Sequence, residues 1–151
     1  MKRKKRKSEK KSGKKLVEKA GLAMKHEFYL EASLIISYLM ERKLKKVRQK
    51  IEKQTINPGF TLDQSIRRVK FLLLSSNQTE LTERFSIVFI DEIRNWKNQR
   101  NEVFRDITER NVSHARMERL ATEGVKLYKT LNNAAKLAKP TIGLSEGEAG
   151  G

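Results

Sequence analysis

The segment WKNQRNEVFRDI, residues 96–107, combines side chains that bind phosphate with aromatic side chains. Arg100 is followed directly by Asn101, and a second arginine, Arg105, lies five residues after the first. A guanidinium binds phosphate through a planar fork of N–H donors, and neighbouring polar side chains can support it. These three residues are therefore a candidate phosphate-binding group.

The segment lies near the end of a predicted helix whose apolar residues recur at three- and four-residue steps. Ile93 and Trp96 belong to the apolar stripe of this helix, and Arg100 continues the stripe. Asn101 and Arg105 are four residues apart and share an adjacent face. A charge in line with a core stripe needs a partner, a route to solvent or a cleft. Arg100 is thus either part of a phosphate site in a cleft, or a residue at the end of a bundle that stacks on Trp96 and reaches solvent.

The periodicity predicts four helices and no strand of useful length. The first helix is expected from Leu16 to Ile51, followed by a turn at NPG, residues 57–59. The second begins at a predicted capping box made by Thr61 and Gln64, in which each side chain bonds to the backbone of the other residue.

The third helix is expected to begin near Thr79 or Glu80 and to run to about Arg105. The fourth begins after Ser113 as N-cap, and Pro140 is expected to end it. The fold predicted from these elements is all-α, a four-helix and mainly antiparallel bundle.

Charge divides the chain into three parts. The whole sequence carries a formal net charge of +16, and ten of its first 15 residues are Lys or Arg against one Glu. We expect residues 1–15 to form a disordered basic arm, residues 16–140 the helical bundle, and residues 141–151 a flexible tail.

The basic arm has the composition of segments that bind polyanions such as RNA, DNA or an anionic membrane surface. The RNA-binding residues predicted in it are Lys2, Arg3, Lys4, Lys5, Arg6 and Lys7. Two alternatives remain open: a solubilising arm with no specific partner and, in a eukaryotic source, a nuclear-import signal.

Several classes of site are excluded by composition. The chain has no cysteine and two histidines, His26 and His114, so neither disulfides nor thiolate or histidine-rich zinc sites are expected. We predict no metal and no cofactor. The apolar runs are too short to span a bilayer, and the N-terminus has no apolar segment of signal-peptide length, so we expect a cytoplasmic protein that does not bind membranes.

Three stretches together resemble the HEPN superfamily of helical bundles. They are EASLIISYLMERKL (31–44), TLDQSIRRVKFLL (61–73) and FIDEIRNWKNQRNEVFRDI (89–107), and the similarity covers roughly Ala23 to Ala138. Members of that superfamily typically form homodimers in which two copies of an arginine–polar–histidine motif face one cleft. Many cleave RNA without a metal and act as toxins or phage-defence effectors, while others are inactive RNA binders or antitoxin partners.

The resemblance assigns the motif arginine to Arg100 and its polar neighbour to Asn101. In the family a histidine follows after four to six intervening residues, and here Arg105 occupies that position. Neither His114, which is separated from Arg110 by only three intervening residues, nor His26 restores the spacing. Histidine can transfer the proton of an attacking ribose hydroxyl near neutral pH, whereas arginine stays protonated and cannot act as that base.

Three explanations for Arg105 stay open: a non-catalytic member of the family, a catalytic member that uses a different base, or an inactivated form of a toxin. We therefore predict a HEPN-like, homodimeric, RNA-acting protein of the toxin or phage-defence endoribonuclease lineage, impaired in cleavage as the sequence stands. The alternative is a non-enzymatic protein that binds nucleic acid, or an antitoxin-type interaction protein, and that uses the basic arm and the cleft. A cognate antitoxin or defence-system protein is a further possible partner.

Overall fold

The computed structural model describes residues 2–52, 61–75 and 85–149, and the side chains of residues 11–52, 61–75 and 85–136. The helices in these ranges are α1 (Lys2–Lys25), α2 (Tyr29–Glu52), α3 (Leu62–Ser75), α5 (Ile87–Glu109) and α6 (His114–Ala149). The prediction of an all-α fold is confirmed. The described residues form five helices, whereas the sequence predicted four. The predicted turn at 57–59 and the predicted helix start near Thr79 or Glu80 lie outside the described residues.

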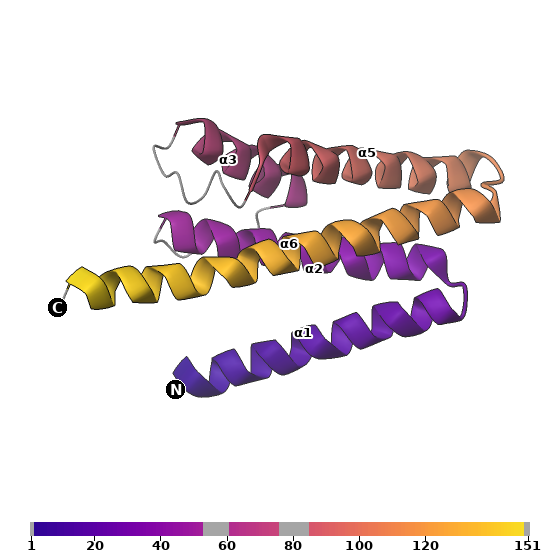
Figure 1. Cartoon of the computed structure of the whole chain (residues 1–151). Coiled ribbons are helices and arrows are strands. Elements are labelled where there is room, and N and C mark those ends of the chain that lie inside the picture. The colour runs from indigo at the N-terminus through magenta and orange to yellow at the C-terminus, as the bar shows by residue number, and fades with distance from the viewer. Residues whose placement is uncertain (1, 53–60, 76–84, 150–151) are drawn as a thin grey trace.

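Helix α2 occupies the centre of the molecule. It packs against α1, α3 and α6, and α5 in turn packs against α3 and α6. Figure 1 shows that the α1–α2 turn and the α5–α6 turn lie at the same end of the bundle. As a result α1 is antiparallel to α2, α5 is antiparallel to α6, and α2 and α6 run in the same direction (Figure 1). The short helix α3 lies over the half of α2 and α5 that is farther from this end.

The single helix predicted from Leu16 to Ile51 is wrong, because the chain turns between Lys25 and Tyr29. Glu27 adopts a left-handed backbone conformation with φ of 62°. The backbone N–H of Phe28 donates to the carbonyl of Ala23 at 2.8 Å, and that of Glu27 donates to the carbonyl of Met24 at 3.1 Å. This pair of bonds defines a Schellman motif, which ends a helix and usually has glycine at the left-handed position. The apolar stripe that was predicted to continue through this turn is therefore also wrong at its start, because Leu22 is exposed.

The two predicted terminal segments are also helical in the structure. Residues 2–15, expected to be disordered, form the first part of α1, and α6 continues beyond Pro140 to Ala149. Lys and Arg have high helix propensity, and α1 is anchored by Ala20 and Ala23, which are buried against the bundle. A proline inside a helix removes one hydrogen bond and commonly bends the helix without ending it.

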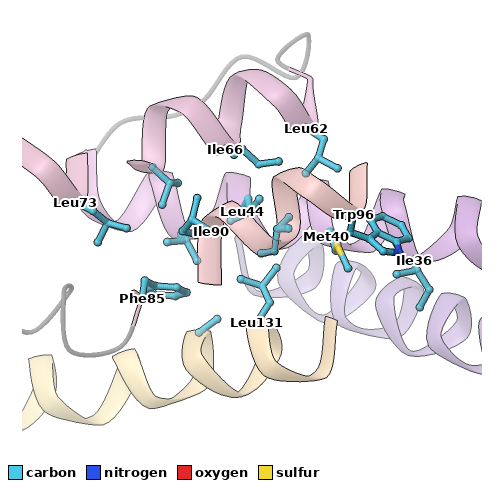
Figure 2. Close-up of a cluster of buried hydrophobic side chains, with 14 of the residues drawn as sticks. Ile36, Met40, Leu44, Leu62, Ile66, Leu73, Phe85, Ile90, Trp96 and Leu131 are labelled. Carbon is cyan, nitrogen blue, oxygen red and sulfur yellow. The ribbon is translucent and has the colours of Figure 1, made fainter. Parts of the chain in front are cut away.

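The core fills the space enclosed by α2, α3, α5 and α6 (Figure 2). Its largest fully buried side chains include Trp96, Phe85, Met40 and Leu44. The buried positions of α2 and α3 follow the spacing of three and four residues that an amphipathic helix requires. They are Ile36, Met40, Leu44 and Val47 on α2, and Leu62, Ile66, Val69 and Leu73 on α3.

Helix starts agree with the sequence where it carried a capping signal. Gln64 Oε1 accepts from the Thr61 N–H at 2.8 Å, and Thr61 Oγ1 accepts from the Gln64 N–H at 3.3 Å, so the predicted capping box is confirmed. Ser113 Oγ caps α6 by accepting from the N–H of Arg116 at 3.2 Å. Helix α5 begins after Ser86, an N-cap that the sequence reasoning missed.

Candidate functional site

Arg100 projects from α5 toward α2. Its Nη1 donates a hydrogen bond to the hydroxyl of Ser37, and its Nε and Nη2 donate to Oδ1 of Asn101 at 3.3 and 2.9 Å. Ser37 is buried, Arg100 is half-buried and Asn101 is exposed. The guanidinium therefore lies at the boundary between the core and solvent, where its donors are held by a hydroxyl and an amide oxygen.

The position of Arg100 follows from the packing of α5. Trp96 and Ile93 are buried on the same stripe, about one and two turns earlier in the helix, respectively. Helix α3 begins beside this part of α5, because Asp63 in its first turn forms an ion pair with Lys97. Arg100 lies almost one turn beyond Lys97, and so beyond the start of α3.

No carboxylate among the described residues lies within ion-pair distance of Arg100. Lys97, three positions earlier, pairs with Asp63, and Lys45 pairs with Glu41 at 3.1 Å. Burial lowers the pKa of Arg100, and the negative charge of Glu41 opposes that effect. An arginine stays protonated even when its pKa falls, so Arg100 is a half-buried cation that forms no ion pair with a carboxylate of the described residues.

Asn101 accepts hydrogen bonds from Arg100, whereas Arg105 projects from another side of α5. Five residues along an α-helix correspond to a rotation of about 140°. Arg105 is exposed, and its charge contributes to lowering the pKa of Asp106, a shift caused mainly by the hydrogen bond from Arg116 to that carboxylate at 2.7 Å. Arg100 and Asn101 are joined by hydrogen bonds, whereas Arg105 projects about 140° around the helix from Arg100.

Neither histidine contacts Arg100. The Nε2 of His114 lies 3.9 Å from Oε2 of Glu27, and its ring centroid lies 5.0 Å from that of Tyr29. His26 lies beside Phe28, with 6.2 Å between the ring centroids. Both histidines are thus at the end of the bundle that holds the α1–α2 turn. Arg100 itself is more than two helical turns from Glu109, the last residue of α5.

Trp96 is a buried residue of the hydrophobic core. Its ring is 1% exposed, and its indole N–H donates to the carbonyl of Leu120 at 2.8 Å. The guanidinium of Arg100 bonds to Ser37 and Asn101, and no cation–π contact between Arg100 and Trp96 is found among the described residues. Trp96 is therefore a core residue, as its place on the apolar stripe predicted.

Ser37 is the site residue that sequence reasoning missed. Ser33 and Ser37 are both buried on α2, and Ser33 donates to the carbonyl of Tyr29 at 2.8 Å. A pair of serines four residues apart within an apolar stripe was the available signal, because one can satisfy its own helix backbone while the other needs a distant partner.

Two other polar features of the described residues, a buried arginine on α2 and a groove between α5 and α6, do not form an anion-binding site. Arg48 of α2 is buried and bonds to Ser65 of α3 at 3.5 Å and to Glu52 at 3.4 Å, an arrangement that joins the two helices. An open groove of about 410 Å³ between α5 and α6 is lined by two carboxylates, Glu92 and Glu123, and by one lysine, Lys126, so its net charge does not favour an anion.

The described residues contain no group of three or more His, Asp or Glu side chains placed to hold a metal ion. None of the described helices is both long enough and apolar enough to cross a membrane.

Comparisons of the chain with protein-family models, with curated proteins and with solved structures found no match. A function for this chain therefore has to be inferred from its own side chains and their arrangement.

Proposed function

We propose that this chain binds RNA through a phosphate group held by Arg100, and that it is a HEPN-like protein of the toxin or phage-defence lineage with impaired cleavage. The observation that carries the proposal is the half-buried guanidinium of Arg100, which has hydroxyl and amide partners and no carboxylate within ion-pair distance among the described residues. A charge taken partly out of water is stabilised by an opposite charge, and a phosphate supplies one.

The arrangement supports binding more than cleavage. Arg105, at the position of the family histidine, stays protonated and projects away from Arg100 within the protomer. His26 and His114 contact other residues near the α1–α2 turn. If the chain does cleave RNA, the expected reaction is attack of a ribose 2′-oxygen on phosphorus, with Arg100 stabilising the developing negative charge. We propose a homodimer, as the resemblance implies, in which two such sites share one cleft.

Binding is tested with an Arg100→Gln variant and with Arg119→Gln as a matched control. Arg119 is exposed on α6, so both changes remove one positive charge but only the first removes the half-buried cation. Loss of a phosphate contact should weaken binding of single-stranded RNA about tenfold and reduce the salt slope by about 0.7. Equal effects of the two variants on affinity would reject Arg100 as the phosphate site.

The lineage is tested by incubating RNA in EDTA with the unaltered chain and with an Arg105→His variant. We expect no cleavage by the unaltered chain and metal-independent cleavage by the variant, because histidine supplies a base with a pKa near neutrality. A variant that is folded and dimeric but inert toward a broad panel of RNAs would reject the endoribonuclease lineage.

A second candidate function, non-enzymatic binding through the basic N-terminal segment, has its own observation. The described lysines of α1 from Lys11 to Lys19 are exposed, and the buried residues of this helix are Ala20 and Ala23. A chain that begins at Leu16 therefore keeps the buried part of α1. If this segment dominates binding, the truncated chain will show much weaker RNA affinity and a much shallower salt dependence. Unchanged affinity and slope would reject this alternative.

A further inference from the structure

Tyr38 is an exposed aromatic residue beside the Arg100 site. It follows Ser37, the residue that accepts the hydrogen bond from Arg100, and its side chain is 53% exposed. Consecutive residues of an α-helix project about 100° apart, so Tyr38 lies on the solvent side of α2 next to the point where Arg100 is held. Leu34, one turn earlier, is 55% exposed and extends the same apolar surface.

A second cation lies against the Tyr38 ring. The guanidinium carbon of Arg42 is 5.8 Å from the ring centroid, which is within the range of a cation–π contact. The surface beside Arg100 thus combines an exposed ring, an apolar neighbour and a positive charge. This is the set of groups that single-stranded nucleic acids use, because bases stack on aromatic rings while phosphates bind to cations.

We infer that Tyr38 stacks against an unpaired base of the RNA whose phosphate is held by Arg100, so that the substrate class is single-stranded RNA or a loop. The inference rests on the proposed function and adds the form of RNA to it. Bases in a duplex are stacked on one another and present their edges, whereas an unpaired base can be turned onto a protein ring. Arg42 would then lie near the backbone of the same nucleotide or its neighbour.

A nucleic acid fits this surface better than a protein partner does. The whole chain carries a formal net charge of +16, the Tyr38 ring is in contact with the guanidinium of Arg42, and the neighbouring residue Ser37 holds the guanidinium of Arg100. An apolar protein surface placed on Tyr38 would bury those cations without an anion, which is unfavourable.

The chain offers a matched control for this contact. Phe71 on α3 is 56% exposed, and the guanidinium carbon of Arg68 lies 5.3 Å from its ring centroid. It has almost the same exposure and the same kind of cation contact as Tyr38, but it lies on another helix and has no contact with Arg100 or Ser37. Loss of Phe71 therefore reports the effect of removing any exposed ring.

The test measures binding of a short single-stranded oligoadenylate and of an RNA duplex of equal length to Tyr38→Ala, Tyr38→Phe, Phe71→Ala and Arg100→Gln variants. Loss of one stacked base should weaken binding of the oligoadenylate about tenfold in Tyr38→Ala, with little change for the duplex. Tyr38→Phe keeps the ring and should bind normally, and Phe71→Ala should match the unaltered chain. Because Tyr38 is exposed, circular dichroism should show the same helix content in all Tyr38 variants.

The outcomes separate this inference from the proposed function. Unchanged binding of both RNAs by Arg100→Gln would reject the proposed function itself. If Arg100→Gln weakens both RNAs while Tyr38→Ala behaves like Phe71→Ala, the phosphate site stands and stacking at Tyr38 is rejected. A change of mass in sedimentation of Tyr38→Ala, without loss of oligoadenylate binding, would assign the surface to protein association and also reject the inference.

Discussion

Arg100 on α5 donates a hydrogen bond to the hydroxyl of Ser37 on α2, a residue 63 positions earlier in the chain. This contact joins the two helices near the start of α3, where Asp63 pairs with Lys97, and it holds the half-buried guanidinium at the boundary of the core. Since α2 and α5 are linked there by a polar contact, the position of Arg100 depends on a residue outside its own motif.

We predict that Ser37→Ala lowers the free energy of unfolding by about 1.5 kcal/mol, because a half-buried charged donor loses its acceptor. Ser33→Ala is the matched control, since Ser33 is also buried on α2 but donates to the carbonyl of Tyr29. Each change is combined with Arg100→Gln, and unfolding by urea is measured for the two double-mutant cycles. Ser37 should couple to Arg100 by about 1 kcal/mol and Ser33 should not. Additive effects at Ser37 would contradict a role in holding Arg100.

Glu27→Gly is expected to stabilise the protein by about 0.5–1 kcal/mol. The left-handed conformation at Glu27 is unfavourable for a residue with a Cβ and is readily adopted by glycine, although glycine also gives the unfolded chain more freedom. The nearby contact between Glu27 and His114 is exposed and long at 3.9 Å, so its loss should matter little. The midpoint of urea unfolding measures the change. Glu27→Ala removes the carboxylate but keeps the backbone strain, so stabilisation by alanine as well would show that strain is not the cause.

The same turn explains why part of the fold could not be predicted from the sequence. Apolar residues continue with helical spacing from Leu22 through Tyr29, and no glycine or proline marks residues 26–28. The break comes from two backbone hydrogen bonds and one unfavourable dihedral angle, none of which has a local sequence signal here. By contrast, Thr61 and Ser113 could be identified as caps because the capping interaction is made within three residues.

The candidate site was predictable to the same limited extent. The helical stripe placed Arg100 in line with Ile93 and Trp96, and the structure has it half-buried there. Its acceptor, Ser37, comes from a different helix, and a contact over so large a sequence separation leaves no local pattern. The angle of about 140° between Arg100 and Arg105 around the helix could be derived from their spacing alone. Which of the two side chains faces α2 could be known only from the packing.

Gly124→Ala is predicted to destabilise the protein by about 1–2 kcal/mol, although alanine favours helix over glycine by about 1 kcal/mol. A Cβ at this position would lie 2.6 Å from Cζ2 of Trp96, a buried ring whose N–H is bonded to Leu120. Gly21→Ala is the control, since a Cβ there meets nothing within 4 Å, and it should stabilise the protein by up to about 1 kcal/mol. Urea unfolding followed by the fluorescence of the single tryptophan reports both effects. Equal stabilisation by both variants would show that Trp96 is free to move.

The free energy of unfolding should fall in acid, and protonation of Asp63 should be one cause. The hydrogen bond from Lys97 is the main cause that lowers the pKa of this carboxyl in the folded protein; partial burial opposes it, and the charges of Lys97, Arg67 and Arg94 add to the lowering. A group whose pKa is lower when folded stabilises the protein above its unfolded pKa of about 3.9, and this contribution is lost as the pH falls through the folded value. Asp63→Asn should therefore be less stable than the unaltered chain at pH 7, and the difference should shrink as the pH falls below about 4.

Lys97→Met provides the second half of this test, because it removes the partner and leaves the carboxyl in place. This variant should likewise be less stable at pH 7. Its free energy of unfolding should depend less steeply on pH below about 4, because the pKa of Asp63 in the folded variant would be closer to its pKa in the unfolded chain. Free energies of unfolding in urea at a series of pH values measure both variants. A constant difference between Asp63→Asn and the unaltered chain across the whole series would mean that the ion pair joining α3 to α5 does not contribute to the acid sensitivity of the fold.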